Sequence, residues 1–241
     1  MSRLLSRSVV ALSGGLILLL CLSACSSRPL VPDWQLSAKS ASEAFVSAYL
    51  SGNARVEALE WAKARRAVAS TGRPDLLARL ELLRCATRVA SLVFEPCTAF
   101  EALRADAPAA ERAYADYLDA RLPSAGRAFL PAGQQRLAGA APAAQADILR
   151  SMDEPLSQLV GAAVLLRAGQ ASPAVMSLAV ETASAQGWRR PLLAWLGAEA
   201  LRAEQAGNAE EAARLRRRMD LVAAPPAVSS PVPRPSPAVS P

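Results

Sequence analysis

Residues 155–186 read PLSQLVGAAVLLRAGQASPAVMSLAVETASAQ, and this stretch decides the fold class. Its apolar side chains recur at helical spacing, and Gly169-Gln170 interrupts the pattern halfway. Ser172 and Pro173 then match an N-cap and the first position of a new helix. The stretch therefore predicts a pair of helices, over 155–168 and 172–186, joined by a short turn.

A second pair of helices is predicted directly afterwards, over 191–206 and 209–222, with Gly207-Asn208 as the turn. Alanine is abundant in the chain, whereas β-branched residues are few and aromatic residues make up only 5%. Because alanine favours helices and β-branched and aromatic residues favour strands, this composition predicts an all-α protein.

The two helix pairs carry small residues at matching positions. Val160-Gly161 and Leu196-Gly197 lie 36 residues apart, and Ala174 and Ala212 lie 38 residues apart. The pattern resembles the tetratricopeptide repeat, in which such residues let the paired helices approach closely. The resemblance implies an α-solenoid-like array of helical hairpins, whose first helices form the usual partner surface. The candidates on that surface are Arg167, Glu199 and Arg202.

Weaker helical patterns precede these pairs. A capping box at Ser40 and Glu43 predicts a first helix that ends near Ser51. The stretch Ser51-Gly52-Asn53-Ala54 repeats the turn of the last pair and hints at a third, degenerate hairpin. Further helices are predicted over 54–70, from Pro74, over 97–105 and from Pro108.

Proline and glycine break the helical pattern between residues 123 and 141, where we expect an irregular connection with one helix around Gln134–Leu137. This connection separates an N-terminal helical region, 38–122, from the C-terminal hairpins, 142–223. A generic helical bundle is the alternative to a solenoid. Residues 224–241 consist of Pro, Ala, Val and Ser with the single charge of Arg234, which predicts a disordered, Pro-rich tail.

The stretch Leu22-Ser23-Ala24-Cys25 resembles the lipobox of bacterial lipoproteins, in which a small residue precedes the cysteine that is acylated. Arg3 and Arg7 form a positive n-region, and the apolar run after them is too short to span a membrane. The resemblance implies that residues 1–24 are a cleaved signal peptide. Cys25 would then carry a diacylglycerol and an N-acyl chain, and residues 25–37 would form a lipidated tether.

Ser26, directly after the acylated cysteine, stands where an aspartate would favour retention in the inner membrane. By the same resemblance, we expect the periplasmic face of the outer membrane rather than the inner membrane. The partners expected there are membrane lipid, through Cys25, and an envelope protein. Nucleic acid is excluded by this location, and removal of Arg3 and Arg7 leaves 25 basic and 21 acidic residues, a modest excess of +4.

Two cysteines remain besides the anchor, Cys85 and Cys97. In an oxidising envelope compartment such an isolated pair is expected to form a disulfide. The bond requires that the chain leave its helix near Leu92 and run back through Pro96, because the two Cα atoms have to lie within about 7 Å. Two buried free thiols are the alternative.

The chain contains no histidine, which excludes Ser-His-Asp and Cys-His catalytic sites and the common zinc sites. We therefore expect no catalytic residue, no metal and no cofactor besides the covalent lipid. Asp116 and Asp119 share a helix face, but the acidic pairs at 153–154 and 210–211 complement helix N-termini. An enzyme would have to work through one acid, as the lytic transglycosylases do. Their Glu-Ser motif has no counterpart here.

Four arginines gather near the end of the last predicted helix: Arg214, Arg216, Arg217 and Arg218. They are candidates for contact with lipopolysaccharide phosphates, acidic lipid headgroups or an acidic partner. The alternative is that they only complement the negative end of the helix dipole. The aromatic residues Tyr114, Tyr117, Trp188 and Trp195 are expected in the core.

Together these features predict a membrane-anchored envelope lipoprotein that serves as a non-catalytic helical scaffold for protein interaction or assembly in the periplasm. Two alternatives stay open. One is an envelope enzyme that acts on peptidoglycan, and the other is a structural lipoprotein that contacts the cell wall.

Overall fold

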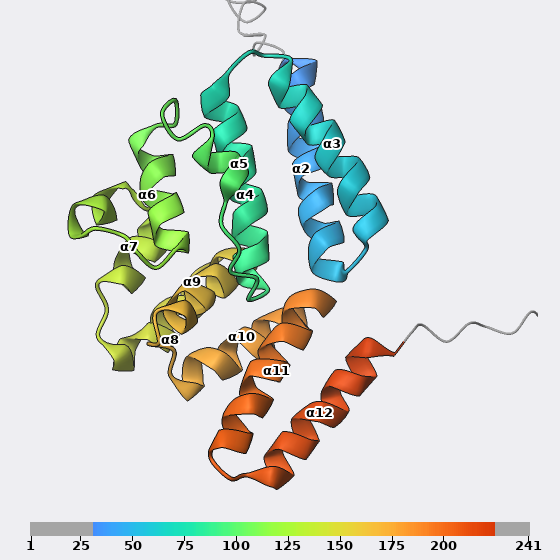
Figure 1. The fold of residues 1–241 in the computed structure, drawn as a ribbon, viewed down its shortest axis with the longest axis vertical. Coiled ribbons are helices and arrows are strands. Elements are labelled where there is room, and N and C mark those ends of the chain that lie inside the picture. Colours follow the sequence, from blue (N-terminus) through green and yellow to red (C-terminus); the bar gives the residue numbers. More distant parts are fainter. Residues whose placement is uncertain (1–30, 225–241) are drawn as a thin grey trace, which may run out of the picture.

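The computed structural model describes residues 31–224, and every regular element in this range is helical (Figure 1). The all-α prediction is thereby confirmed. No helix between residues 31 and 224 has the length and apolar character needed to cross a bilayer. The predicted signal peptide, Cys25 and the tail from residue 225 onward lie outside the described residues. The elements are α2 Asp33–Ser51, α3 Ala54–Ala69, α4 Pro74–Ala90, α5 Thr98–Glu101, α6 Ala109–Leu118, η1 Ser124–Phe129, α7 Ala132–Ala138, η2 Pro142–Ala144, α8 Gln145–Arg150, α9 Pro155–Arg167, α10 Pro173–Ala185, α11 Arg189–Gln205 and α12 Ala209–Ala223.

The first helix begins at Asp33, directly after Pro32, and not at the capping box predicted at Ser40. Ser40 lies within α2 on its exposed side. The additional turns bury Ala38 in a small core between α2, α3 and the first half of α4. The predicted tether therefore ends earlier than expected, because residues 33–37 belong to the helix.

The turn between α2 and α3 is built like the turn between α11 and α12. Gly52 has a φ of 84°, a left-handed conformation that ends α2 and turns the chain back. The Asn53 N–H donates to the Ala48 carbonyl at 2.8 Å, and the Asn53 side chain then caps α3. Gly207 and Asn208 repeat this arrangement between α11 and α12. The predicted repetition of the turn is confirmed.

The two C-terminal hairpins, α9–α10 and α11–α12, use their small residues differently. In the second hairpin, a Cβ built on Gly197 would lie 3.6 Å from Met219 of α12, so this glycine does face its paired helix. In the first hairpin, a Cβ on Gly161 would lie 2.7 Å from Leu137 and from Leu149. Gly161 therefore makes room for α7 and α8, and the expectation that it faces α10 is wrong.

Ala174 and Ala212 differ in the same way. Ala212 is buried against α11, whereas Ala174 is exposed. Helix α9 packs against α4, α6, α7 and α8 as well as α10, so it has more neighbours than the first helix of an isolated repeat.

The main core runs without interruption from α4 to α12. Trp195 of α11 is fully buried, and its Nε1–H donates to the Ala90 carbonyl at the end of α4, at 3.1 Å. Arg190, at the start of α11, forms an ion pair with Glu57 of α3 at 3.4 Å. The division expected at residues 123–141 is therefore not a division of the core. These contacts between distant helices also depart from an open array, in which each unit touches only its neighbours.

Cys85 and Cys97 are disulfide-bonded, with Cα atoms 6.0 Å apart. Helix α4 ends at Ala90, and Leu92 takes a positive φ of 60° that turns the chain back along the helix. This is the exit near Leu92 that the disulfide prediction requires. The bond ties the segment before α5 to the middle of α4.

Candidate functional site

A groove of about 530 Å³ opens between α4, α6, α9 and the segment that follows η1. This volume falls within the roughly 300–1,000 Å³ typical of ligand-binding clefts. Most of its wall is apolar, and the side chains that matter most here are Leu82, Leu83, Tyr114, Phe129, Leu156 and Val160.

Helical periodicity brings these side chains together. Leu82 and Ala86 of α4 lie four residues apart on one face, as do Leu156 and Val160 of α9. The 3₁₀ helix η1 ends at Phe129, whose ring is 52% exposed at the rim of the groove. The groove therefore has an exposed aromatic edge and a buried aliphatic floor.

The charged side chains of the groove form an incomplete network. Arg79 donates through Nε to Glu111 Oε1 at 2.7 Å, and its Nη2 lies 2.5 Å from the same oxygen. Glu111 is only 7% exposed, and its second oxygen, Oε2, has no hydrogen-bond partner among the described residues. A buried acceptor without a donor is costly, so it points to a donor supplied from outside. Glu154 adds a second carboxylate, which leaves the groove with more negative than positive charge.

Tyr114 lies one helical turn after Glu111 and lines the same groove. Burial raises the pKa of its phenol to about 12. The hydroxyl is therefore protonated at neutral pH and can donate a hydrogen bond. The centroid of the Tyr117 ring, one turn further along α6, lies 6.0 Å from the centroid of the Tyr114 ring.

Three of the four arginines predicted as an anionic contact, Arg214, Arg217 and Arg218, lie three and four residues apart and so share one face of α12. Arg214 pairs with Glu211 at 2.7 Å between Nε and Oε2, and Arg216 pairs with Glu204 of α11. Arg217 and Arg218 have no ion pair among residues 31–224. Arg216 points to another side of the helix, because successive residues point about 100° apart. Contact of these arginines with an anionic group stays a prediction.

The other candidate polar residues are engaged within the fold. Asp116 pairs with Arg104 at 3.1 Å, and Asp119 pairs with Arg167 at 3.0 Å, so the two aspartates are not a free acid–base pair. Glu199 is buried and accepts a hydrogen bond from the Ser177 hydroxyl at 2.8 Å. Of the three residues expected on a solenoid partner surface, only Arg202 is exposed without an ion pair in the described part of the chain.

The groove itself was not foreseen from the sequence. Glu111 lies in the first turn of α6, where an acidic side chain normally serves to complement the positive end of the helix dipole. Its position three residues before the apolar Tyr114 was the available signal, because that spacing puts the carboxylate on the buried face. The partner arginine, Arg79, comes from a helix 32 residues away in the sequence.

Three other carboxyl groups are held in their charged form by neighbouring arginines. The carboxyl groups of Asp75, Glu101 and Glu211 have pKa values below their ordinary range, in each case chiefly because an arginine side chain hydrogen-bonds to them. Residues 31–224 contain no cluster of three or more His, Cys, Asp or Glu side chains that could hold a metal ion. Comparisons with protein-family models, with curated protein sequences and with solved structures find no match to this chain.

Proposed function

We propose that this chain is an envelope lipoprotein, anchored by acyl chains on Cys25, whose helical domain acts without catalysis as an interaction scaffold in the periplasm. The groove between α4, α6 and α9 is the surface that holds a partner protein. One observation carries this proposal: an apolar groove that contains a buried carboxylate oxygen, Glu111 Oε2, without a hydrogen-bond donor.

The groove specifies the chemistry of the partner. Its apolar walls favour aliphatic or aromatic side chains, each of which gains roughly 1.5–3 kcal/mol when fully buried. A lysine or arginine at the centre of the segment would donate to Glu111 Oε2. Its charge would also balance the one negative charge by which Glu111 and Glu154 exceed Arg79. The occupant we infer is therefore an apolar segment of a partner protein that carries one cationic side chain.

The sequence around Cys25 supports the location. The lipobox-like stretch Leu22–Cys25 and Ser26 after it favour lipid attachment and the outer membrane. Two or more acyl chains would give stable anchoring, at about 0.8 kcal/mol for each buried CH₂ group. The disulfide between Cys85 and Cys97 is compatible with an oxidising compartment.

We also propose that α9–α12 are two degenerate hairpins of the tetratricopeptide type. The 36-residue spacing, the Ser172 and Asn208 caps and the contact of Gly197 with Met219 support this relation. In the first hairpin Gly161 has a different use, since it receives Leu137 and Leu149. On this view the first repeat contributes one wall of the groove, through Leu156 and Val160 of α9.

The groove proposal is tested with three peptides that share one apolar sequence and differ at the central residue, which is lysine, norleucine or glutamate. Binding is measured by fluorescence anisotropy against the full-length protein in lipid nanodiscs. We expect the lysine peptide to bind on the order of tenfold more tightly than the norleucine peptide, because a charge-assisted hydrogen bond is worth roughly 1.5–3 kcal/mol. The glutamate peptide should bind most weakly.

Glu111→Gln should abolish the preference for lysine while retaining an oxygen for Arg79. Glu210→Gln, an exposed carboxylate on α12, is the matched control and should leave all three affinities unchanged. Equal affinities for the three peptides, or binding of none, would contradict the proposal.

Glu111 is also the observation that favours the alternative, an enzyme acting on peptidoglycan. A carboxyl group in a cleft with apolar walls is a plausible general acid. Purified protein incubated with peptidoglycan sacculi should release no soluble glycan if the scaffold proposal is right. Glycan release that Glu111→Gln eliminates would replace the scaffold with the enzyme.

A further inference from the structure

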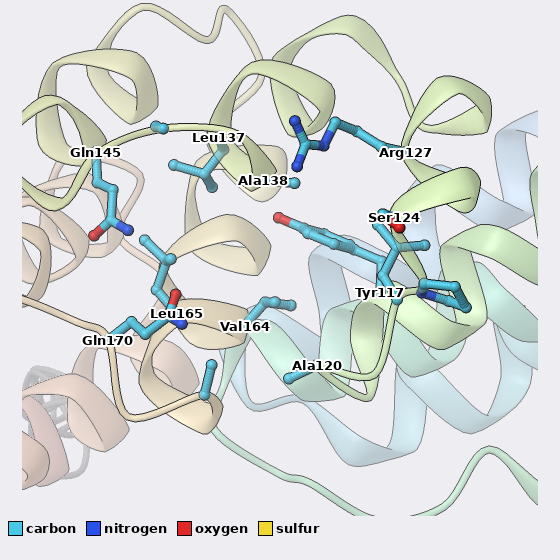
Figure 2. A pocket seen from close by; sticks show the side chains of 14 residues that line it. Tyr117, Ala120, Ser124, Arg127, Leu137, Ala138, Gln145, Val164, Leu165 and Gln170 are labelled. Carbon is cyan, nitrogen blue, oxygen red and sulfur yellow. The ribbon is translucent and has the colours of Figure 1, made fainter.

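A second cavity, of about 220 Å³, opens beside the C-terminal end of α6 and is shown in Figure 2. It is lined by the end of α6, η1, α7, α8 and α9, and it shares no lining residue with the groove. Whatever it binds is therefore recognised independently of the partner segment proposed above.

Two side chains that line this cavity contain buried polar atoms without partners. Tyr117 is 4% exposed and Gln145 is 3% exposed. The Tyr117 hydroxyl and Gln145 Oε1 make no hydrogen bond to any described residue. In the described part of the chain, Glu111 Oε2 in the groove is the remaining buried side-chain atom of this kind. Native proteins satisfy most buried polar atoms, so their placement at cavities calls for a ligand or bound water.

Arg127 supplies the charge of the cavity. Its guanidinium has no ion pair among residues 31–224, whereas that of Arg121, the preceding arginine, pairs with Asp119. A Cβ built on Gly139 would lie 2.6 Å from Arg127 Nη1, so the absence of a side chain at 139 lets the guanidinium lie across the end of α7. Figure 2 shows this guanidinium and the Tyr117 hydroxyl directed toward the same opening, with the amide nitrogen of Gln145 facing it.

No carboxylate lines the cavity, whose polar side chains are Tyr117, Ser124, Arg127, Gln145 and Gln170. Gln145 Oε1 is an acceptor and would need a bound water, whereas the remaining polar groups can all donate. Arg127 contributes N–H donors and a positive charge, and Tyr117, Ser124 and the Gln145 amide add neutral donors. Burial raises the pKa of Tyr117 above its ordinary range, so its hydroxyl keeps its proton. A site with several donors, one cation and no anion is complementary to a carboxylate.

We propose that this cavity binds a small carboxylic acid with a short apolar body. The carboxylate lies against Arg127 and the Tyr117 hydroxyl, and the apolar part lies against Leu137, Val164 and Leu165. The volume is below the roughly 300 Å³ of the smallest drug-sized pockets, which limits the ligand to a short chain. The same chemistry is offered by a free aliphatic acid and by the C-terminus of a peptide that ends in small residues.

The test uses the full-length protein and four probes: hexanoate, hexanamide, N-acetyl-Ala-Ala and its C-terminal amide. Binding is followed by chemical-shift changes in the NMR spectrum as each probe is titrated. We expect saturable shifts with at least one carboxylate and none with its matched amide. Saturation by hexanoate alone identifies a free acid as the ligand, and saturation by the dipeptide alone identifies a peptide C-terminus. No saturable binding of either acid, or equal binding of acid and amide, would overturn the proposal.

Three variants test the assigned contacts. Arg127→Gln should weaken binding on the order of tenfold or more, because it removes a charge-assisted hydrogen bond. Tyr117→Phe should weaken it by several-fold and should fold normally, since its hydroxyl has no partner to lose. Gly139→Ala keeps every donor but displaces the guanidinium, so it should also weaken binding.

Arg136→Gln is the matched control. Arg136 is an exposed arginine on α7 that does not line the cavity. Its replacement should leave the affinity unchanged. An equal loss of affinity in Arg136→Gln and Arg127→Gln would show that only general surface charge is measured, and the proposed site would be wrong.

Discussion

Replacing both Cys85 and Cys97 by alanine is expected to lower the free energy of unfolding by about 3 kcal/mol. The bond closes a loop with a sequence separation of 12. In the chain-entropy relation, a loop of about this length restricts the unfolded chain by roughly 9–10 cal/mol/K, which is about 3 kcal/mol at 25 °C. For a domain of this size, 1 kcal/mol shifts the melting temperature by roughly 2–4 °C, so we expect a decrease of about 6–12 °C.

The assay is thermal unfolding followed by circular dichroism, with and without a reducing agent. Reductant should lower the melting temperature of the unaltered protein to that of the double variant and should leave the variant unchanged. Changing both cysteines together avoids a free thiol that could form intermolecular bonds. A decrease below about 2 °C, or two free thiols titrated in the unfolded, unreduced protein, would refute the reasoning.

The remaining predictions concern the anchor, the core and the helix caps. Cys25→Ala should abolish incorporation of a clickable fatty acid and leave an unprocessed precursor; normal labelling would disprove the assignment of Cys25. Trp195→Phe should destabilise the protein by about 1–3 kcal/mol, because the buried carbonyl of Ala90 loses its donor. Chemical denaturation measures this loss. A decrease in the free energy of unfolding of less than about 0.5 kcal/mol would mean that the hydrogen bond is absent. Asn208→Ala and Asn53→Ala should each cost about 1 kcal/mol in the same assay, since both side chains cap a helix, and stability unchanged in both would show that the shared turn is not held by its caps.

Local patterns predicted the local structure well. Apolar periodicity, the Ser172 cap and the Gly-Asn turns depend on residues close together in the sequence, and the structure contains the helices and turns that they indicate. The disulfide was also predictable, because Cys85 and Cys97 form an isolated pair, and the reversal that the bond requires occurs at Leu92. One exception was the start of α2, where the Ser40 box is a valid capping signal but burial of Ala38 extends the helix. Another was the helix expected over 97–105, of which only Thr98–Glu101 is α-helical.

Contacts between distant segments were not predictable from the same patterns. The role of Gly161 depends on Leu137 and Leu149, which come from the stretch with the weakest helical signal. The groove depends on Arg79 and Glu111, which belong to different helices and appear separately as ordinary surface charges in the sequence. Pairing across helices decides which charges are neutralised and which remain available.

The central claim is that the groove beside α6 holds a partner segment in the envelope. The most direct measurement places a photo-crosslinking amino acid at Phe129 in the lipidated protein, in living cells, and compares it with the same group at Leu201. These two side chains are exposed to nearly the same extent, 52% and 55%, but only Phe129 lines the groove. We expect one protein adduct from position 129, reduced by Glu111→Gln and by the lysine peptide, and none from position 201. Equal adducts at both positions, or an adduct at 129 that neither change reduces, would contradict the account.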